Sequence, residues 1–325
     1  MASIAEPLNV AIAVQHLRPF DPRRDMQAVA DLIELGFSDT LDEDGQRYLS
    51  QMRAAANSYN SLHWLGIAGY FSSYSMSGFV WEEDGQVVGN LSMIPYLINA
   101  RRCYLIANVV VSPAYRRRGI GYALTARAIE QARSMGSPTT WLHVREENGG
   151  AIKLYQSLGF IERARRTTWQ AQGEAPRLRY PDHITIMTRR NKDWAQQRNW
   201  LRENYPAELL WNLPLNLHAL QPGILGSFSR FFNDASIDQW SIFNYDQLAG
   251  VTAWQSVLGN TNAIWLAAPK NVDDAVLQAL LLHTRRNIST RRPLVLDYPS
   301  GQSAAAIEAA GFQPHQTLIW MEKKL

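Results

Sequence analysis

The chain has 325 residues, of which 46% are hydrophobic, enough to fill two cores of about 150 residues each. Its 32 Lys and Arg residues against 29 Asp and Glu give a formal charge of +3, too slight to indicate nucleic acid binding. The single cysteine, Cys103, excludes an internal disulfide and a cysteine-based metal site, and no apolar run approaches the ~18 residues of a membrane span. We therefore expect a cytoplasmic protein with no metal, nucleic acid or membrane partner, in which an oligomer is possible but not indicated.

The first part of the chain reads as a strand, two helices and a hairpin. Residues 10–17 are predicted to form a strand, and apolar spacing predicts helices over 26–37 and 43–56. Two strands at 78–82 and 86–96 flank Asp84 and Gly85, an Asp-Gly hairpin signal. A third strand over 103–111 completes an antiparallel meander that feeds a strand-helix-strand-helix unit, and this order predicts an α/β architecture.

The next stretch joins a strand, a glycine loop and a helix. The run Val109, Val110, Val111 ends at a Ser-Pro pair, and the sextet Arg116-Arg117-Arg118-Gly119-Ile120-Gly121 opens an amphipathic helix. Glycines let the backbone approach a ligand closely, and the first turn of a helix offers free N–H groups to an anion. The loop is therefore predicted to hold a phosphate.

A second motif follows after a predicted strand at 139–144. Asn148 precedes a helix in which Ala151, Leu154, Tyr155 and Leu158 share one face, and Gly159 ends it. In order and spacing the two motifs resemble those of the GCN5-related N-acetyltransferases (GNAT). The family's loop pattern matches Arg116, Gly119 and Gly121, and its second signature matches Asn148, Ala151, Leu154, Tyr155, Gly159 and Phe160.

The resemblance implies a GNAT fold, which is a mixed and mostly antiparallel sheet flanked by helices. It also implies that the protein uses acetyl-CoA as acyl donor. It implies transfer of an acetyl group to a primary amine by direct attack in a ternary complex. The loop N–H groups would hold the pyrophosphate, and the backbone before the loop would pair with the pantetheine arm, with an N–H near Val110 facing the thioester carbonyl. The implied cofactor-binding residues are Val109, Val110, Val111, Arg116, Arg117, Arg118, Gly119, Ile120, Gly121, Tyr122, Asn148, Ala151 and Tyr155.

Tyr155 is the predicted general acid, because a tyrosine at this place in the family protonates the coenzyme A sulfur; its alternative is a core aromatic. His143 is the predicted base, at a position where the branch that acetylates protein N-termini commonly carries glutamate. An imidazole of unperturbed pKa near 6.5 suits proton removal, although a satisfied structural histidine is the alternative. Asn148 would contact the cofactor or only cap its helix. Other candidates for the base are Glu82, Glu146 and Glu147. Cys103 is predicted to be a buried strand thiol rather than a nucleophile.

The second half of the chain is predicted to repeat the first weakly. Strands at 162–170 and 183–189 would close a first domain at residues 1–190, and 191–210 would form a helical connector. Residues 211–325 then offer strands at 240–244, 248–258 and 263–268, a helix at 273–285, a strand at 294–297 and a last helix ending at Gly311. Aligning Gly311 with Gly159 places Ile307 on Tyr155, and Asp273 and Asp274 stand near the phosphate position. We predict two GNAT copies in tandem, the second degenerate and without acetyl-CoA.

The acceptor is the open question of the sequence. A small-molecule amine is our first expectation, with a protein N-terminus or lysine as the alternative. A non-catalytic acyl-CoA-binding regulatory protein is a third possibility, which the intact Tyr155 disfavours. An aromatic stretch in the region where the family shapes its acceptor pocket is either pocket or ordinary core: His63, Trp64, Tyr70, Phe71 and Tyr74.

Overall fold

The computed structural model describes residues 15–38, 41, 43–57, 77–98, 100–176, 181–213, 215–222, 237–256, 262–288 and 293–325. It divides into two compact units, one of Met1–Arg163 with Trp320–Leu325 and one of Ala164–Ile319. Most of the strand predicted at 10–17, and the whole aromatic stretch from His63 to Tyr74, lie outside the described residues. Among the described helices, none is both long and apolar enough to cross a membrane.

The first unit has the predicted order of strands and helices. Its elements are β1 (Leu17–Pro19), α2 (Pro22–Phe37), α3 (Glu43–Asn57), β2 (Ser77–Glu83), β3 (Gln86–Ile98), β4 (Arg101–Val111), η1 (Pro113–Tyr115), α5 (Ile120–Ser134), β5 (Thr139–Arg145), α6 (Gly149–Ser157) and the start of β6 (Ile161–Ala171). The predicted hairpin is confirmed, because Asp84 and Gly85 turn between β2 and β3 with φ of 51° and 76°. The strand order is β1-β2-β3-β4-β5-β12-β6, where β12 is Phe312–Lys324.

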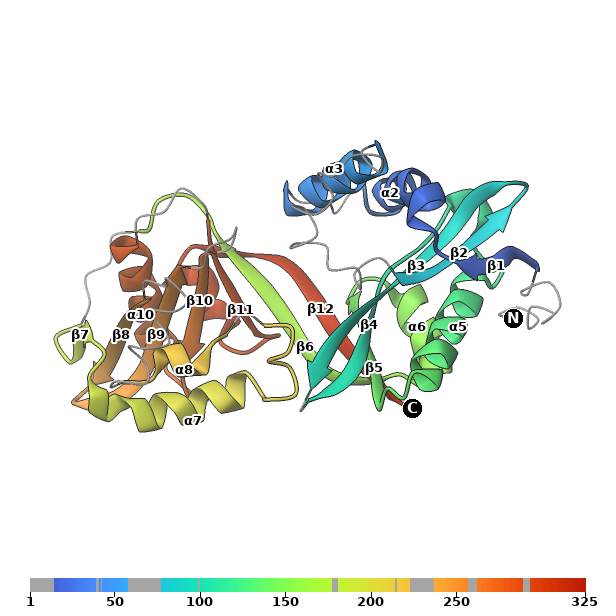
Figure 1. Cartoon of the computed structure of the whole chain (residues 1–325). Helices are drawn as coiled ribbons and strands as arrows, with labels where there is room; N and C mark the ends of the chain where they lie inside the picture. Colours follow the sequence, from blue (N-terminus) through green and yellow to red (C-terminus); the bar gives the residue numbers. More distant parts are fainter. Residues whose placement is uncertain are drawn as a thin grey trace, which may run out of the picture. The chain divides into compact units, whose positions relative to one another are not determined.

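Helices α2 and α5 cover opposite faces of this sheet (Figure 1). A Cβ on Gly36 of α2 would clash with Val110, whereas a Cβ on Gly89 would lie 2.9 Å from Ile120 of α5. Gly89 and its neighbour on β3 pair with consecutive residues of β4, Val111 and Val110, whose side chains point to opposite faces. An apolar layer between α2, α3 and the sheet includes Met26, Val29, Ile33, Leu49, Met52, Val80 and Val110.

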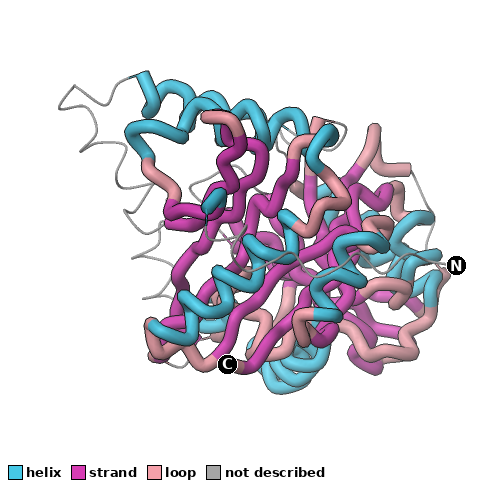
Figure 2. Tube along the Cα trace, turned by 90° about the vertical axis from the view of Figure 1, so that its right-hand side faces the viewer, coloured by secondary structure: helices cyan, strands magenta, loops and turns pink. Residues whose placement is uncertain are grey.

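The second unit repeats this arrangement. Its elements are β7 (Ile184–Thr188), η2 (Asn191–Asp193), α7 (Trp194–Asn204), α8 (Leu217–Leu220), β8 (Ile237–Asn244), β9 (Gln247–Ser256), β10 (Asn262–Ala267), α10 (Asp274–Asn287), β11 (Leu294–Pro299) and α11 (Ala304–Ala309). Strands β7 to β10 pair antiparallel and β10 pairs parallel with β11, as β1 to β4 and β5 do in the first unit. Figure 2 traces the whole chain with helices in cyan and strands in magenta. The predicted internal repeat is therefore confirmed at the level of strand pairing.

The strand partners differ from those predicted. Of the two strands expected to close the first domain, β6 lies between β12 and β11, and β7 pairs with β8 of the second unit. Helix α7, which was predicted to be a connector, packs on β10 as an element of the second unit. The sequence prediction did not include β12, whose final residues Trp320–Leu325 belong to the first unit. Strand patterns give the direction of side chains but not the identity of the neighbouring strand, which explains these differences.

Candidate active site

A bulge in β4 opens the sheet next to β5. The pairs Asn90–Val110 and Ser92–Ala107 show one extra residue on β4, and Asn108 has φ of +50°. Parallel pairing of β4 with β5 ends at Ile106 and Leu142, although β4 continues to Val111 and β5 to Arg145. Beyond the bulge, the edge of β4 that carries Val109, Val110 and Val111 therefore has no register partner on β5.

The loop after β4 leads directly into the start of α5. Gly119 is the N-cap with φ of 79°, and no side chain caps the helix there. Arg117 also has a positive φ, of 67°. The guanidinium of Arg116 donates to the Val111 carbonyl at 3.1 Å, and the exposed Arg118 lies 3.4 Å from Glu83 and over the Tyr115 ring. The result is an uncapped helix N-terminus among three arginines, which suits an anion.

Gly121 lies in the first turn of α5, and Ile120 before it is buried in the core. A Cβ added at Gly121 would meet the Leu154 side chain at 3.4 Å, an ordinary contact. The fold therefore tolerates a side chain at this position, and its absence leaves room beside the helix start. Tyr122, the next residue, is 47% exposed.

Helix α6 brings the second motif beside the first. Asn148 is its N-cap, and the side-chain oxygen accepts from the backbone N–H of Ala151 at 3.1 Å. Tyr155 is buried, contacts Phe160 edge to face, and has its pKa raised by burial to about 12. Its hydroxyl is therefore protonated at neutral pH, as a proton donor requires.

His143 lies on β5 just beyond the last residue paired with β4. Its ring contacts that of Trp320 with centroids 4.1 Å apart, and burial lowers its pKa to about 4. The imidazole is therefore neutral at physiological pH. Because the ordinary value is 6.5, burial also makes it a weaker base than the sequence implied.

The side chains of His143 and Tyr155 belong to opposite sides of the sheet. On β3, Met93 shares the face of Gly89, which is the α5 face, and Met93 pairs with Ile106. Ile106 pairs in turn with Leu142, so Leu142 faces α5 and His143 faces the α2 side. Tyr155 comes from α6, which contacts α5. The two groups therefore lie on opposite faces of the sheet.

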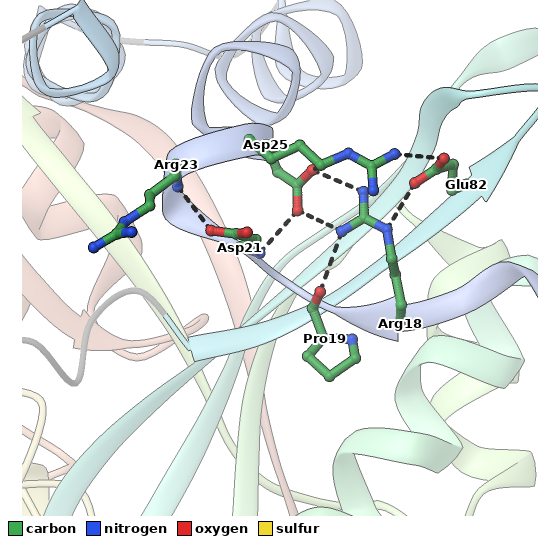
Figure 3. Close-up of polar contacts among 7 residues, drawn as sticks. Arg18, Pro19, Asp21, Arg23, Asp25 and Glu82 are labelled. Carbon is green, nitrogen blue, oxygen red and sulfur yellow. Dashed lines mark hydrogen bonds and ion pairs between the residues drawn. The ribbon is translucent and has the colours of Figure 1, made fainter. Parts of the chain in front are cut away.

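The other candidates from the sequence are engaged elsewhere. Glu82 accepts from Arg18 at 2.7 Å and from Arg24 at 2.6 Å, and these bonds hold its pKa below the ordinary value (Figure 3). Glu147 is exposed and lies 3.5 Å from Arg145, and Glu146 is also exposed. Cys103 is only 1% exposed, so it is the buried strand thiol that was expected.

The corresponding places in the second unit are occupied by its own residues. Parallel pairing of β10 with β11 ends at Ile264, and β10 pairs with β9 without a register shift. Just beyond, the Leu266 N–H donates to the Tyr205 hydroxyl at 3.3 Å, and the Asn204 amide donates to the Ala268 carbonyl at 3.0 Å. Both side chains come from the end of α7.

Two further groups differ between the units. The Asp273 carboxylate caps α10 by accepting from Ala275 and Val276, so the helix end that is uncapped in α5 is filled here. Asp297, the residue after the last β10–β11 pair, forms an ion pair with the buried Arg166, at the place that His143 has in the first unit. Burial raises the pKa of Asp297, and the nearby charge of Arg166 offsets only part of this rise.

Comparisons with known proteins identify the family of the chain. The profile of the Acetyltransferase (GNAT) family matches residues 40–160. An N-alpha-acetyltransferase of Sulfurisphaera tokodaii is 32% identical over 117 residues, which are 32% of this chain and 68% of that protein. The chain belongs to the GNAT family of acetyltransferases.

Other relatives match shorter shares of this GNAT chain. The ribosomal protein bS18-alanine N-acetyltransferase of Escherichia coli (strain K12) is 47% identical over 55 residues, 17% of this chain and 37% of that enzyme. The chain thus spans little more than a third of that relative. Mycothiol acetyltransferase of Thermobispora bispora is 31% identical over 148 residues, 44% of this chain and 45% of that protein.

The likeness in fold covers both units. A GCN5-related N-acetyltransferase from Sphaerobacter thermophilus has a TM-score of 0.54 and 16% identity, and the match covers 95% of both chains. Together with the repeated strand pairing, this confirms the predicted α/β fold, a GNAT fold in two tandem copies.

Sequence reasoning missed two residues at the opening, Asn90 and Asn108. A signal for Asn108 was present, because an asparagine interrupts the apolar run from Leu105 to Val111, and asparagine is enriched at positive φ. Asn90 carried no such signal. Its role depends on a partner in the neighbouring strand.

Proposed function

We propose that this protein is an acetyl-CoA-dependent N-acetyltransferase whose chemistry resides in the N-terminal part of the chain, residues 1–190, and whose acceptor is the primary amine of a small molecule. The observation that carries the proposal is the opening between β4 and β5, which is followed along the chain by the start of α5, where Gly119 is the N-cap and no side chain caps the helix. An extended backbone edge followed by an uncapped helix end suits a ligand with an amide-bearing arm and a pyrophosphate.

Acetyl-CoA would supply the acetyl thioester, and the residues of the opening have separate tasks. The N–H groups at the start of α5 and the nearby arginines would hold the pyrophosphate. The edge of β4 at Val109 to Val111 would align the pantetheine arm. Tyr155, whose hydroxyl is protonated at neutral pH, would give a proton to the departing sulfur. His143, on the other side of the sheet, would face the incoming amine.

We further propose that the second copy binds no acetyl-CoA and serves as a scaffold. Three observations support this: Asp273 fills the helix end, Tyr205 and Asn204 fill the backbone edge of β10, and Ile307 replaces the tyrosine. The Asp273 carboxylate would also repel a pyrophosphate. The chain should therefore bind one coenzyme A.

The test has two parts. Calorimetry of the full chain with coenzyme A should give one site, and thiol release from acetyl-CoA should rise when an accepted amine is added from a panel of small-molecule amines. Two sites per chain would contradict the scaffold role of the second copy. Binding without thiol release, across amines and peptides, would favour a regulatory acyl-CoA-binding protein.

A protein N-terminus is the second candidate acceptor. It is favoured by the relatives, since the two matches at 47% and 32% identity are named for a ribosomal protein alanine and for N-alpha acetylation. The same thiol-release assay with short peptides separates the two cases. Turnover of a free N-terminal peptide above that of every small amine would replace the small-molecule proposal.

A further inference from the structure

Asn90 is a polar side chain buried in an apolar layer. It is 1% exposed and pairs across the strands with Val110, on the face that α2 and α3 cover. Leaving a buried amide without a partner is costly, so the position must supply one. The partner is the backbone carbonyl of Asn108, which accepts from the Asn90 amide at 3.0 Å.

Asn108 is the bulged residue, and its conformation needs support. Among the described residues, it is the only non-glycine with a positive φ that lies within a strand; the others lie in turns, in the phosphate loop or at a helix cap. Such a backbone costs free energy unless its surroundings fix it. The Asn108 side chain donates to Ser92 Oγ at 3.3 Å, and Tyr48 of α3 also bonds to it. Asn90 thus bonds to the backbone carbonyl of the bulged residue, and Ser92 and Tyr48 bond to its side chain.

The second unit offers an internal comparison. Strand β10 has no bulge, as its pairing with β9 is continuous from Asn262 to Ala267. There the backbone edge is not open but is bonded by Tyr205 and Asn204. Within this chain, the strand with the bulge, β4, has the open backbone edge, whereas the strand without a bulge, β10, has an edge that is bonded by side chains.

We propose that Asn90 is a positioning residue for the acetyl-CoA slot: by holding the Asn108 carbonyl it fixes the bulge that turns Val109 and Val110 away from β5. The inference rests on the proposed function, because it assigns acetyl-CoA to the opening. It adds a residue that contacts no part of the ligand and acts through the backbone of β4.

The experiment is calorimetry of acetyl-CoA binding to the full chain. Asn90→Ala should weaken binding about 10- to 100-fold, the range that corresponds to one unmade buried hydrogen bond. Asn90→Leu, which keeps the branched shape of the side chain but has no donor, should show the same loss if the alanine variant folds poorly. Ser137→Ala, which removes another buried hydrogen bond of the first unit, to the Thr139 carbonyl, should bind like the wild type.

A second-site change separates positioning from general stability. Glycine adopts a positive φ without strain, so Asn108→Gly in the Asn90→Ala background should restore most of the affinity while the melting temperature stays lowered. Unchanged affinity in folded Asn90→Ala and Asn90→Leu would overturn the inference, as would recovery of affinity only in step with stability. A wild-type chain that binds no acetyl-CoA would instead refute the proposed function itself.

Discussion

Tyr155 has a buried ring and a hydroxyl that stays protonated at neutral pH. Removing that hydroxyl as Tyr155→Phe should lower kcat by about 10²-fold, the usual scale for one acid–base group, with acetyl-CoA affinity nearly unchanged. Steady-state kinetics and calorimetry together give both quantities. Tyr104→Phe, at a buried tyrosine on β4 of the same unit, is the matched control. Full kcat in Tyr155→Phe with chemistry rate-limiting would remove the general-acid assignment.

His143 predicts where the pH–rate profile falls. Its pKa in the folded chain is lowered to about 4, so the ring is neutral and able to accept a proton above that value and is lost as a base below it. We expect kcat/KM to decline with a midpoint near pH 4 rather than near 6.5, and His143→Gln to remove this limb. His16→Gln, which alters a histidine stacked on Trp81, is the control. A limb centred near pH 6.5 that survives in His143→Gln would point to another base.

At the level of single residues, the sequence predicted the residues of the two motifs but not the packing around them. Spacing placed Tyr155 on a helix face and His143 on a strand, and both are found there. The sequence could not show that Trp320, far along the chain, would pack on His143 and help to bury it. A pKa depends on that burial, which is a property of long-range packing.

Among the elements, β1, α2 and β2 are joined by a network of charged side chains (Figure 3). Arg18 donates to Asp25 at 2.6 and 2.8 Å and to Glu82 at 2.7 Å, and Asp25 is 1% exposed. Burial acts to raise the pKa of Asp25, but the bonds from Arg18 and from the Asp21 N–H outweigh it and hold the value below 3.8. The network therefore connects the first strand to the helix above it.

Asp25→Asn should lower the free energy of unfolding by about 1–3 kcal/mol near neutral pH, because it leaves Arg18 with one anionic partner. Since the folded pKa is depressed, this stability is fully present above pH 3.8 and is lost as the pH falls through the folded value. Thermal melts from pH 7 to pH 2.5 should therefore show the two chains converging at the acid end. Asp31→Asn, at an exposed ion pair with Arg53, should change little at any pH. A constant gap down to pH 2.5 would contradict the role of the charge.

The space beside Gly121, at the start of α5, leads to a prediction for two substitutions. Since a Cβ at Gly121 meets only an ordinary contact, Gly121→Ala should leave the melting temperature within a few degrees of the wild type. Gly121→Glu should abolish coenzyme A binding, because the carboxylate would occupy the place of the pyrophosphate and repel it. Calorimetry and melting curves of both variants give the answer. Unchanged binding in folded Gly121→Glu would place the cofactor elsewhere.

The elements themselves were largely predictable, and their partners were not. Helical spacing and the Asp-Gly turn gave α2, α3, α5 and the β2–β3 hairpin close to their final limits. Strand β12 was missed, because Leu318 to Met321 is an uninterrupted apolar run without the alternation that marks a half-buried strand. Which strand lies beside β6 is decided by packing across the whole chain.

For the whole molecule, the last residues of the chain complete the first unit. Within it, Arg163 pairs with Glu322 at 2.6 Å, Trp320 packs on His143, and the Leu325 N–H donates to the Pro138 carbonyl at 3.0 Å. A fragment of residues 1–190 lacks all three contacts. We expect it to melt below the full chain, and a peptide of residues 312–325 added in excess to raise its melting temperature by mass action.

The matched control is the same peptide with Trp320→Ala, which should stabilise the fragment less. A fragment as stable as the first unit of the full chain, and indifferent to the peptide, would mean that the predicted boundary at residue 190 already encloses a complete folding unit.

The division of β12 between the two units also has a consequence for synthesis of the protein on the ribosome. Residues 1–163 emerge early, but the segment that completes their sheet, Trp320–Leu325, is made more than 150 residues later. At 5–20 residues per second, the first unit waits roughly 10–30 s for its final strand, with His143 and the edge of β5 uncovered meanwhile. Nascent chains that stop before Trp320 would carry the whole glycine loop, Arg116 to Gly121, and Tyr155, yet would lack the strand that covers His143.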